Sequence, residues 1–463
     1  MSLTLLVWLI LFAAFSVMAL VRPVWGWAVY VLTFFACPAL WWWGKGTIGE
    51  YRWALYGGII FLIAGLAGLG GQKQRTESPL ARWTKWSAVA ILANATFVHF
   101  ALSSNWEISS GPYIDLAKYV LLFGMLVASI RNERDLRFVL LSIVIGAAYI
   151  GYEVTINDRG SIQNGRLEGI GVPSASDANG MACLVVTILP LTGVFFIAGK
   201  WWERLIALPA APFIVNVLLL CNSRGAFLAA IGSGVVFVVV APPKVRIQAL
   251  KVTALGCVAV WMLLGDPQIV SRFMTTFAET EERDNSAASR LDYWMAGLRM
   301  VSDYPLGTGG DGFHNIHGPK YISQINGADF SSRSVHNGFI NEACDWGVQG
   351  IVLRMAFLLG ALMLLRRTGV RAARRGDQFA TMAACGLIAG MAGFLIQSIF
   401  GDFVDNEWGY WMAALAVAHA SVCAVGRSNS VGPWGQFMMV PVPDPVIQSP
   451  APATFATANQ FSE

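Results

Sequence analysis

Charged residues are scarce in this sequence, and that scarcity excludes most soluble folds. Only 13% of the 463 residues are charged, whereas 56% are hydrophobic and the mean hydropathy is +0.56. An ordinary soluble chain carries about 25% charged residues, because a globule must cover its core with polar groups. The apolar runs are long and unbroken, unlike the short alternating segments of a β-barrel. The composition therefore predicts an all-α, polytopic integral membrane protein.

Several functional motifs are also absent. The chain has no zinc-type Cys/His spacing, no Walker loop and no dinucleotide fingerprint, and its net charge of +4 is too small to indicate a nucleic-acid partner. The seven cysteines are widely separated, which favours small buried hydrophobes over a disulfide framework. Residues 1–4 carry no basic charge, so we expect the first apolar run to stay in the membrane.

Long apolar runs predict thirteen membrane spans, since a span needs about 20 apolar residues. The predicted spans are 3–20, 27–43, 53–70, 86–104, 113–130, 138–156, 181–199, 204–221, 225–242, 248–265, 347–365, 378–400 and 408–424. Arg22-Pro23 separates the first two only briefly, which leaves twelve spans as the alternative. The Pro- and Ala-rich residues 426–463 indicate a disordered cytoplasmic tail.

Basic residues are concentrated in alternate loops, and this bias predicts the orientation of the chain. These cations are Lys73, Arg75, Arg82, Lys85, Arg131, Arg134, Arg137, Lys200, Arg204, Lys244, Arg246, Lys251, Arg366, Arg367, Arg371, Arg374 and Arg375. Short loops rich in Lys and Arg stay in the cytoplasm. The opposite side then holds segments 157–180 and 266–346, together with a short acidic loop that contains Asp402, Asp405 and Glu407.

The first polar feature on that outer side is Ser223-Arg224-Gly225, which lies between two apolar runs. An arginine that faces lipid at a helix centre costs about 2.5–3.5 kcal/mol. Arg224 could instead extend its side chain to the headgroups, although the positive-inside bias disfavours an arginine at the outer face. Gly225 would allow another backbone to approach closely.

The second feature is Arg290 and Asp292, in a segment with helical periodicity. Its apolar residues recur at helical spacing: Leu291, Trp294, Leu298 and Val301. This spacing predicts an amphipathic helix at the surface or in the membrane interface, and the run from Pro305 to Gly312 predicts a tight loop after it. Alone, Arg290 and Asp292 are equally typical of a solvated helix face.

The third feature is His336-Asn337, which leads directly into a predicted span that contains Asp345 near its start. A histidine at such a position can accept a proton near neutral pH, or it can simply anchor the helix end. His314 and His317 lie nearby, but they lack the i,i+4 spacing of a helical metal site, so we expect no metal.

At these three places the sequence resembles the O-antigen ligase and polymerase superfamily of bacterial envelope glycosyltransferases. The resemblance covers roughly residues 130–425, and Asp345 stands where the family usually has Glu. A fainter similarity of Arg22-Pro23-x-Trp25-Gly26 is to members encoded beside exosortase systems. The principal matches are Ser223-Arg224-Gly225, Arg290-Leu-x-x-Trp294, Pro305-x-Gly307-x-Gly309, His336-Asn337, Asp345-x-Gly347-x-x-Gly350 and Asp177-Ala-Asn179-Gly180.

The resemblance implies an inner-membrane enzyme that moves a glycan from undecaprenyl diphosphate to an acceptor hydroxyl on the periplasmic face. The acceptor would be a glycan, a lipid or a protein. By the resemblance, Arg224 and Arg290 bind the diphosphate and His336 takes the acceptor proton. Arginine suits this role because its planar fork binds phosphate oxygens bidentately and stays charged. Supporting residues would be Ser223, Asp292, Asn337, Asp345 and Asn179.

By the resemblance, residues 131–425 form an O-antigen ligase-like catalytic membrane domain, which includes the periplasmic loop 266–346 and follows N-terminal transmembrane helices in 1–130. The chain has no Asp-x-Asp, so we expect neither a metal-bridged diphosphate nor a cofactor. Ligase and polymerase activity stay equally open, because such relatives share the same donor chemistry.

The alternative function is a transporter or flippase of lipid-linked glycans, which would need ionisable residues buried in mid-span. Few are evident: Lys118, Glu153 and His419 lie near span ends or alone, and Arg354 follows His336 closely. An internal repeat, typical of many transporters, is not evident either. A structural scaffold gives no reason for a long outer loop with arginines and a histidine.

Overall fold

The computed structural model describes residues 2–69, 77–163, 165–263, 285–326 and 333–430. Residues Met1–Cys423 form one compact unit, and Ala424–Glu463 form a second. The tail predicted to be disordered lies outside the described residues from 431 onward, as do parts of the long loop at 266–284 and 327–332. The boundary predicted between residues 130 and 131 stays a prediction.

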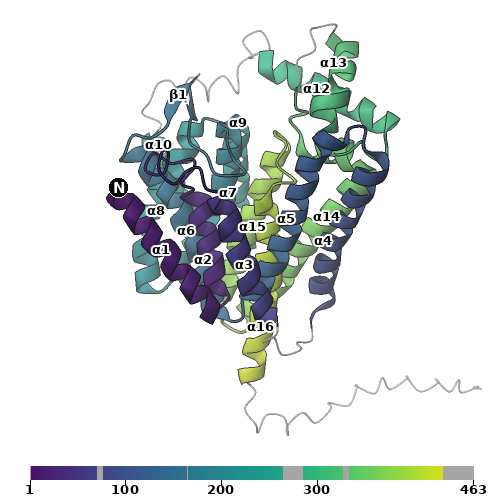
Figure 1. Ribbon diagram of the computed structural model, residues 1–463. Coiled ribbons are helices and arrows are strands. Elements are labelled where there is room, and N and C mark those ends of the chain that lie inside the picture. Colours follow the sequence, from purple (N-terminus) through teal and green to yellow (C-terminus); the bar gives the residue numbers. More distant parts are fainter. Residues whose placement is uncertain (1, 70–76, 164, 264–284, 327–332, 431–463) are drawn as a thin grey trace, which may run out of the picture. The chain divides into compact units, whose positions relative to one another are not determined.

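The fold is all-α and polytopic, as the composition predicts (Figure 1). Eight helices of the described residues are long and apolar enough to cross a membrane, and α2, α9 and the Trp53–Ala67 part of α3 are shorter apolar helices. The described elements are α1 (Leu3–Val21), α2 (Val24–Phe35), α3 (Trp53–Leu69), α4 (Pro79–Phe97), the π-helical η1 (Val98–Leu102), α5 (Trp106–Ser129), α6 (Glu133–Thr155), β1 (Ser161–Gln163), β2 (Arg166–Glu168), α7 (Ala178–Ala198), α8 (Trp201–Cys221), α9 (Arg224–Val240), α10 (Pro243–Leu263), α12 (Asn285–Asp303), the π-helical η2 (Phe313–His317), α13 (Gly318–Asn326), α14 (Gly338–Arg374), α15 (Gln378–Ser398) and α16 (Glu407–Ser430).

Each of the thirteen predicted spans overlaps a helix, but only eight helices of the described residues are long and apolar enough to be spans, so the predicted number stays a prediction. The second predicted span is also too long. The sequence predicts a span over 27–43, whereas α2 ends at Phe35 and turns follow up to residue 52. Pro38 explains this end, because proline lacks an N–H and disfavours helical backbone in the residue before it. The Trp41 indole also donates a hydrogen bond of 2.8 Å to the Phe35 carbonyl, which occupies the open end of the helix.

Side-chain caps fix where several helices begin. A Ser, Asn or Asp side chain accepts a hydrogen bond from a first-turn N–H that would otherwise lack a partner. The capping residues are Ser78 for α4, Asn105 for α5, Asn132 for α6, Asp177 for α7, Asn337 for α14 and Asp377 for α15. Each cap lies in the connection that precedes its helix, so these residues mark where the chain re-enters the bundle.

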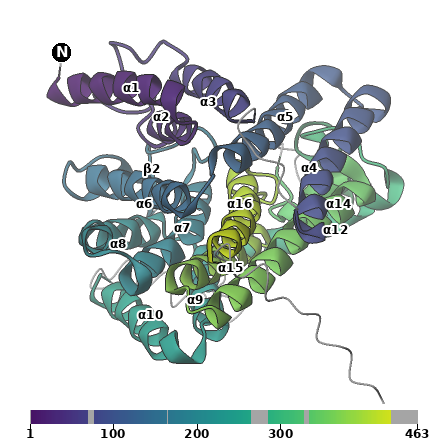
Figure 2. The same cartoon turned by 90° about the horizontal axis from the view of Figure 1, so that it is seen from below.

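The interior forms around α7, α15 and α16. Helix α15 packs against α7, α9 and α14, and α14 also packs along α4. Viewed along the bundle in Figure 2, α16 lies in the middle, and its residues 408–418 are fully buried. Gly386 and Gly390 of α15 permit the close packing, since an added Cβ at Gly390 would lie 2.4 Å from the Thr187 carbonyl oxygen of α7.

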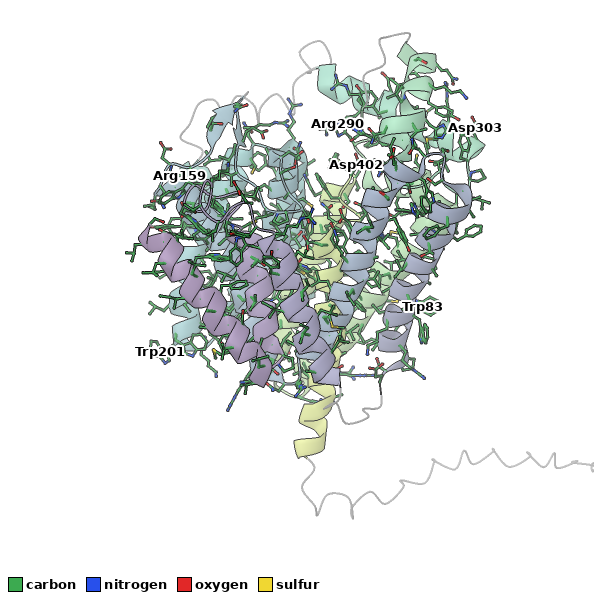
Figure 3. All side chains as sticks on the ribbon, in the orientation of Figure 1. Trp83, Arg159, Trp201, Arg290, Asp303 and Asp402 are labelled. Atoms are coloured by element: carbon green, nitrogen blue, oxygen red, sulfur yellow. The ribbon has the colours of Figure 1, made fainter. Side chains whose placement is uncertain are left out.

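The α5–α6, α7–α8 and α14–α15 connections meet at one end of the bundle. Arg137 at the start of α6 pairs with Glu203 of α8 at 2.7 Å, and its guanidinium lies 3.5 Å from the ring centre of Phe379 in α15. The α8–α9 corner, α12 and the start of α14 lie at the opposite end. In Figure 3, Arg290 and Asp402 mark this second end, and Trp201 and Trp83 mark the first.

Candidate functional site

The corner between α8 and α9 contains Arg224. Helix α8 ends at Cys221, Asn222 adopts a left-handed conformation with φ of 47°, and α9 begins at Arg224. The Asn222 side chain donates a 3.0 Å hydrogen bond to the Gly165 carbonyl, which ties the corner to the β-hairpin loop. A Cβ at Gly225 would lie 2.8 Å from the Phe400 Cβ and 2.9 Å from the Gln397 Oε1, so side chains and not another backbone make the close approach at this glycine. The half-buried Arg224 thus starts α9 at a rigid corner.

Arg290 of α12 lies within electrostatic range of Arg224. Burial and then the charge of Arg224 lower the pKa of Arg290, and the carboxylate of Asp402 acts in the opposite direction. The structure therefore brings together two arginines that lie far apart in the sequence. Two like charges in a half-buried place repel each other, and this arrangement favours a bound anion that neutralises both.

A third arginine, which the sequence analysis missed, belongs to the same group. Arg166 on β2 has a pKa that is lowered by burial and then by Arg290, with a further contribution from Arg224. Its Nε is buried and has no hydrogen-bond partner. One sequence feature could have identified Arg166: it lies in segment 157–180, which is predicted to face the outer side, where the positive-inside bias disfavours arginine. We call Arg166, Arg224 and Arg290 the arginine cluster.

His336 adjoins the arginine cluster in an unusual backbone conformation. Its φ of 56° is left-handed, and its carbonyl accepts a hydrogen bond of 3.3 Å from the Trp294 indole of α12. Burial and then Arg290 lower the pKa of His336 to about 4, while Asp177 acts to raise it. The imidazole is therefore neutral at pH 7, and Arg290 is its strongest electrostatic neighbour.

Asp402, between α15 and α16, holds the backbone at His336. Its two carboxylate oxygens accept hydrogen bonds from the His336 N–H at 3.2 Å and the Asn337 N–H at 2.9 Å. The Gly338 N–H also donates to the Gly401 carbonyl at 2.9 Å. Asp402 is half-buried, and burial raises its pKa to about 6. The sequence analysis placed Asp402 in an outer acidic loop but gave it no role.

The predicted supporting residues take different positions. Asn337 caps α14, as its Oδ1 accepts from the Phe339 and Ile340 N–H groups at 3.1 and 3.2 Å. Ser223 is buried beside Arg224, and its hydroxyl accepts from the Gln397 amide at 3.5 Å. Asp292 is half-buried on α12, and Asn179 is half-buried in the first turn of α7.

Asp345 supports a loop instead of contributing to the arginine cluster. Its carboxylate accepts from the Gly312 N–H and from the Asn341 amide, each at 3.0 Å. The loop from Pro305 to Gly312 is tight, as predicted, with φ values of 94° at Gly307 and 93° at Gly309. Asp345 thereby fixes the segment that follows α12.

Helix α12 is present where the sequence predicts it, and the predicted apolar stripe is divided: Trp294 and Val301 pack against a small core, whereas its two leucines do not. The predicted apolar stripe includes Leu291 and Leu298, which are 61% and 51% exposed. The buried residues are Ala296 and Met300, in a small core with Phe313 and Val335. The neighbouring Gly297 explains this choice, because its bare backbone lets α14 approach: a Cβ there would lie 2.6 Å from the Ile340 Cγ2.

The other histidines of this region have separate partners. His317 Nε2 lies 2.9 Å from the Ser104 hydroxyl, and His314 Nδ1 lies 3.5 Å from the Ser334 hydroxyl. Within the described residues, no group of three or more His, Cys, Asp or Glu side chains is arranged to hold a metal ion. His336 is distinguished from His314 and His317 by the strong electrostatic influence of Arg290.

A buried ion pair bears on the transporter alternative. Arg354 and Glu342 of α14 are both about 1% exposed and pair at 3.0 Å, and Arg354 also donates to the Tyr410 hydroxyl of α16. Removing either partner of such a pair would leave an uncompensated buried charge. Each charge has a partner within the protein. The buried pair is therefore explained by a structural role, the link between α14 and α16, and it gives the transporter alternative no support.

These features define a polytopic helical membrane protein with an arginine cluster and a neutral histidine at one end of its bundle. Residues 209–355 match the family model described as O-antigen ligase. The match supports the O-antigen ligase superfamily and suggests a glycan-transferring, glycosyltransferase-like ligase or polymerase. The matched range contains Arg224, Arg290 and His336, whereas Arg166 and Asp402 lie outside it. No curated protein matches the chain.

Proposed function

We propose that the protein transfers a glycan from undecaprenyl diphosphate to an acceptor hydroxyl at the periplasmic face of the bacterial inner membrane, without a metal ion. The observation that carries this proposal is the convergence of Arg224 and Arg290 beside His336. Glycan transfer releases a diphosphate leaving group and a proton from the acceptor hydroxyl. The arginine cluster can bind the diphosphate, and His336 can accept the proton.

The arginine cluster fits the leaving group. As the bond between the donor sugar C1 and the diphosphate oxygen breaks, negative charge grows on the diphosphate and must be stabilised. Arginine forks bind phosphate oxygens bidentately and remain charged at any relevant pH. A bound diphosphate would also relieve the repulsion between Arg224, Arg290 and Arg166. The cluster is thus arranged for a divalent or trivalent anion.

His336 fits the acceptor proton. The acceptor oxygen attacks C1, the bond from C1 to the diphosphate breaks with its electron pair going to the diphosphate, and the hydroxyl proton passes to the neutral imidazole. A pKa of about 4 makes the free imidazole a weak base. The negative charge of a bound donor offsets Arg290 and raises that pKa. His336 therefore becomes a stronger base when the donor, with its diphosphate leaving group, is bound.

The proposed membrane orientation follows from the basic connections at the end of the bundle opposite the arginine cluster. The basic connections there contain Arg131, Arg134, Lys200, Arg371 and Arg374, and such loops stay in the cytoplasm. The arginine cluster would then face the periplasm. A cysteine at exposed Ser302 of α12 should react with an impermeant thiol reagent from outside, and one at exposed Arg374 should not. The reverse labelling pattern would refute the orientation.

The activity test is transfer by the purified protein in proteoliposomes, with an undecaprenyl-diphosphate glycan as donor and candidate acceptors supplied separately. We expect transfer that persists in excess EDTA. Transfer that EDTA abolishes and a divalent cation restores would refute the metal-independent mechanism. Movement of intact donor across the bilayer, with no glycosidic bond formed to any acceptor, would favour a flippase instead.

A further inference from the structure

A polar cavity lies at the end of the bundle opposite the arginine cluster. It has a volume of about 710 Å³ and is lined by residues of the α1–α2, α5–α6 and α7–α8 connections. Its floor includes the buried Pro23, Val24 and Ser129, and its rim includes the exposed Arg134 and Lys200. Transfer of a glycan at the other end gives this cavity no role.

The lining of this basic cavity carries excess positive charge. The cationic residues that line it are Arg22, Arg131, Arg134, Arg137 and Lys200, and the carboxylates are Glu133 and Asp135. Arg22 pairs with Asp135, while Arg137 pairs with Glu133 and with Glu203 behind the lining, both at 2.7 Å. The cations therefore outnumber the nearby carboxylates even when Glu203 is included. A cavity of this charge favours an anion, and guanidinium groups favour phosphate oxygens.

Apolar side chains beside the basic cavity indicate what carries that phosphate. Leu20 and Val21, directly before Arg22, are 81% and 82% exposed. Trp201, directly after Lys200, and Leu205, one helical turn further on, are 77% and 63% exposed, and Trp201 is labelled at this end in Figure 3. Such residues suit acyl chains below a headgroup. Helices α1 and α8 are both candidate membrane spans, so a lipid whose headgroup enters the basic cavity would lay its acyl chains against these residues.

We propose that the basic cavity binds the phosphodiester headgroup of an anionic phospholipid, whose acyl chains cover the exposed faces of α1 and α8. Basic pockets between transmembrane helices at the cytoplasmic side are suited to anionic headgroups. The headgroup would join three connections that Arg22 and Arg137 already link through ion pairs. The lipid therefore stabilises the bundle at this end and leaves the chemistry at the other end unchanged.

The test uses the full-length protein in nanodiscs of phosphatidylcholine, with or without phosphatidylglycerol. Thermal unfolding and mass spectrometry of retained lipid report stability and occupancy. We expect phosphatidylglycerol to be retained selectively and to raise the unfolding temperature. An Arg131→Gln/Arg134→Gln double variant should bind phosphatidylglycerol about 25-fold more weakly, since each cation near the surface contributes about fivefold, or about 1 kcal/mol.

The matched control is Arg371→Gln/Arg374→Gln, which removes the same charge at the α14–α15 connection and outside the cavity. We expect less than a twofold change there. Should the Arg131→Gln/Arg134→Gln variant not fold, Lys200→Gln is the substitute, because Lys200 is exposed and its contact with Glu203 uses the backbone N–H. Equal losses in the cavity variant and the control would overturn the proposal.

Two further outcomes are decisive. Inorganic phosphate in the phosphatidylcholine nanodiscs should give little protection. If phosphate protects as well as phosphatidylglycerol, the cavity is a free-phosphate site and the lipid assignment is wrong. Equal retention of phosphatidylcholine and phosphatidylglycerol would contradict any anion site. Glycan transfer can fail or succeed without affecting either measurement, so this proposal stands apart from the proposed function.

Discussion

The two ends of the bundle use arginine in opposite ways. At one end, Arg137 forms ion pairs with Glu133 and Glu203, and these pairs hold helix connections together. At the other end, the strongest electrostatic neighbour of Arg290 is another arginine, Arg224. The fold accounts for the ion pairs of Arg137, although the cations that line the basic cavity still outnumber its carboxylates. Cations that face one another destabilise the empty site, and this cost is understandable where an anionic substrate binds.

The largest expected effect is at His336, the proposed base beside the arginine cluster. General-base catalysis contributes about 10² to 10⁴ in rate, so His336→Ala should lower kcat for transfer by that factor while donor binding changes little. The matched controls are His314→Ala and His317→Ala, whose side chains bond to serines in the same region. Turnover near wild type in His336→Ala would eliminate the proposed base.

The pH dependence sharpens the same point. The pKa of His336 is lowered to about 4, so the neutral base persists well below the ordinary histidine range. The acid limb of kcat/KM, which reports the free enzyme, should therefore fall nearer pH 4 than 6.5. The limb of kcat should lie at higher pH because the bound donor offsets Arg290. For folding, this shift contributes stability above pH 6.5 that is lost as the pH falls toward 4.

The next effect is the loss of the guanidinium fork. Arg224→Lys and Arg290→Lys keep the charge but lose bidentate binding. A hydrogen bond to a charged group contributes about 1.5–3 kcal/mol, so each variant should lower kcat/KM about 10- to 100-fold. Arg299→Lys, at an exposed position on the same helix as Arg290, is the control and should be neutral. Full activity in both lysine variants would show that charge alone suffices.

A similar but smaller loss is expected at Asp402, which positions His336. Asp402→Ala removes the acceptors for the His336 and Asn337 N–H groups, whereas Asp402→Asn retains one oxygen. We expect a decrease in kcat of about tenfold for alanine, from roughly 1–1.5 kcal/mol, and partial rescue by asparagine. Donor affinity should stay the same in both. A loss confined to folding yield, with normal kcat in the folded fraction, would reduce Asp402 to a structural residue.

The smallest effect is expected at Arg166, the third member of the arginine cluster. Arg166→Gln removes one of three cations while Arg224 and Arg290 remain, so the donor KM should rise roughly three- to tenfold, in line with about 1 kcal/mol per cation. Arg159→Gln is the control, because Arg159 belongs to the same loop but its guanidinium lies 4.5 Å from the ring centre of Trp42. An unchanged donor KM in Arg166→Gln would remove it from the site.

The sequence carried more information about the helices than about the site. Apolar length located each span, because burial in lipid demands long hydrophobic segments, but it overran at Trp41, where an apolar side chain packs in a turn. The apolar stripe of α12 identified Trp294 and Val301 as packed residues but missed Ala296 and Gly297, because helical periodicity gives small residues little weight. Local sequence contains no record of which side chains meet across distant elements.

The site shows the same limit. Arg224, Arg290 and His336 were proposed from the family resemblance, and the structure places them within electrostatic range. Arg166 and Asp402 were missed as site residues because each acts through long-range contacts. Arg166 reaches the cluster from the β-hairpin, and Asp402 reaches His336 from a loop that follows it by more than sixty residues. Neither contact can be recognised from the residues that neighbour Arg166 or Asp402 in the sequence.

The most direct test of the central claim is a double-mutant cycle on the binding of undecaprenyl diphosphate in the presence of EDTA. The variants are Arg224→Gln, Arg290→Gln and the double variant. If both arginines bind one diphosphate, their losses in binding free energy should be non-additive, with a coupling of about 0.5–3 kcal/mol. Additive losses, or undiminished binding in the double variant, would contradict a shared diphosphate site.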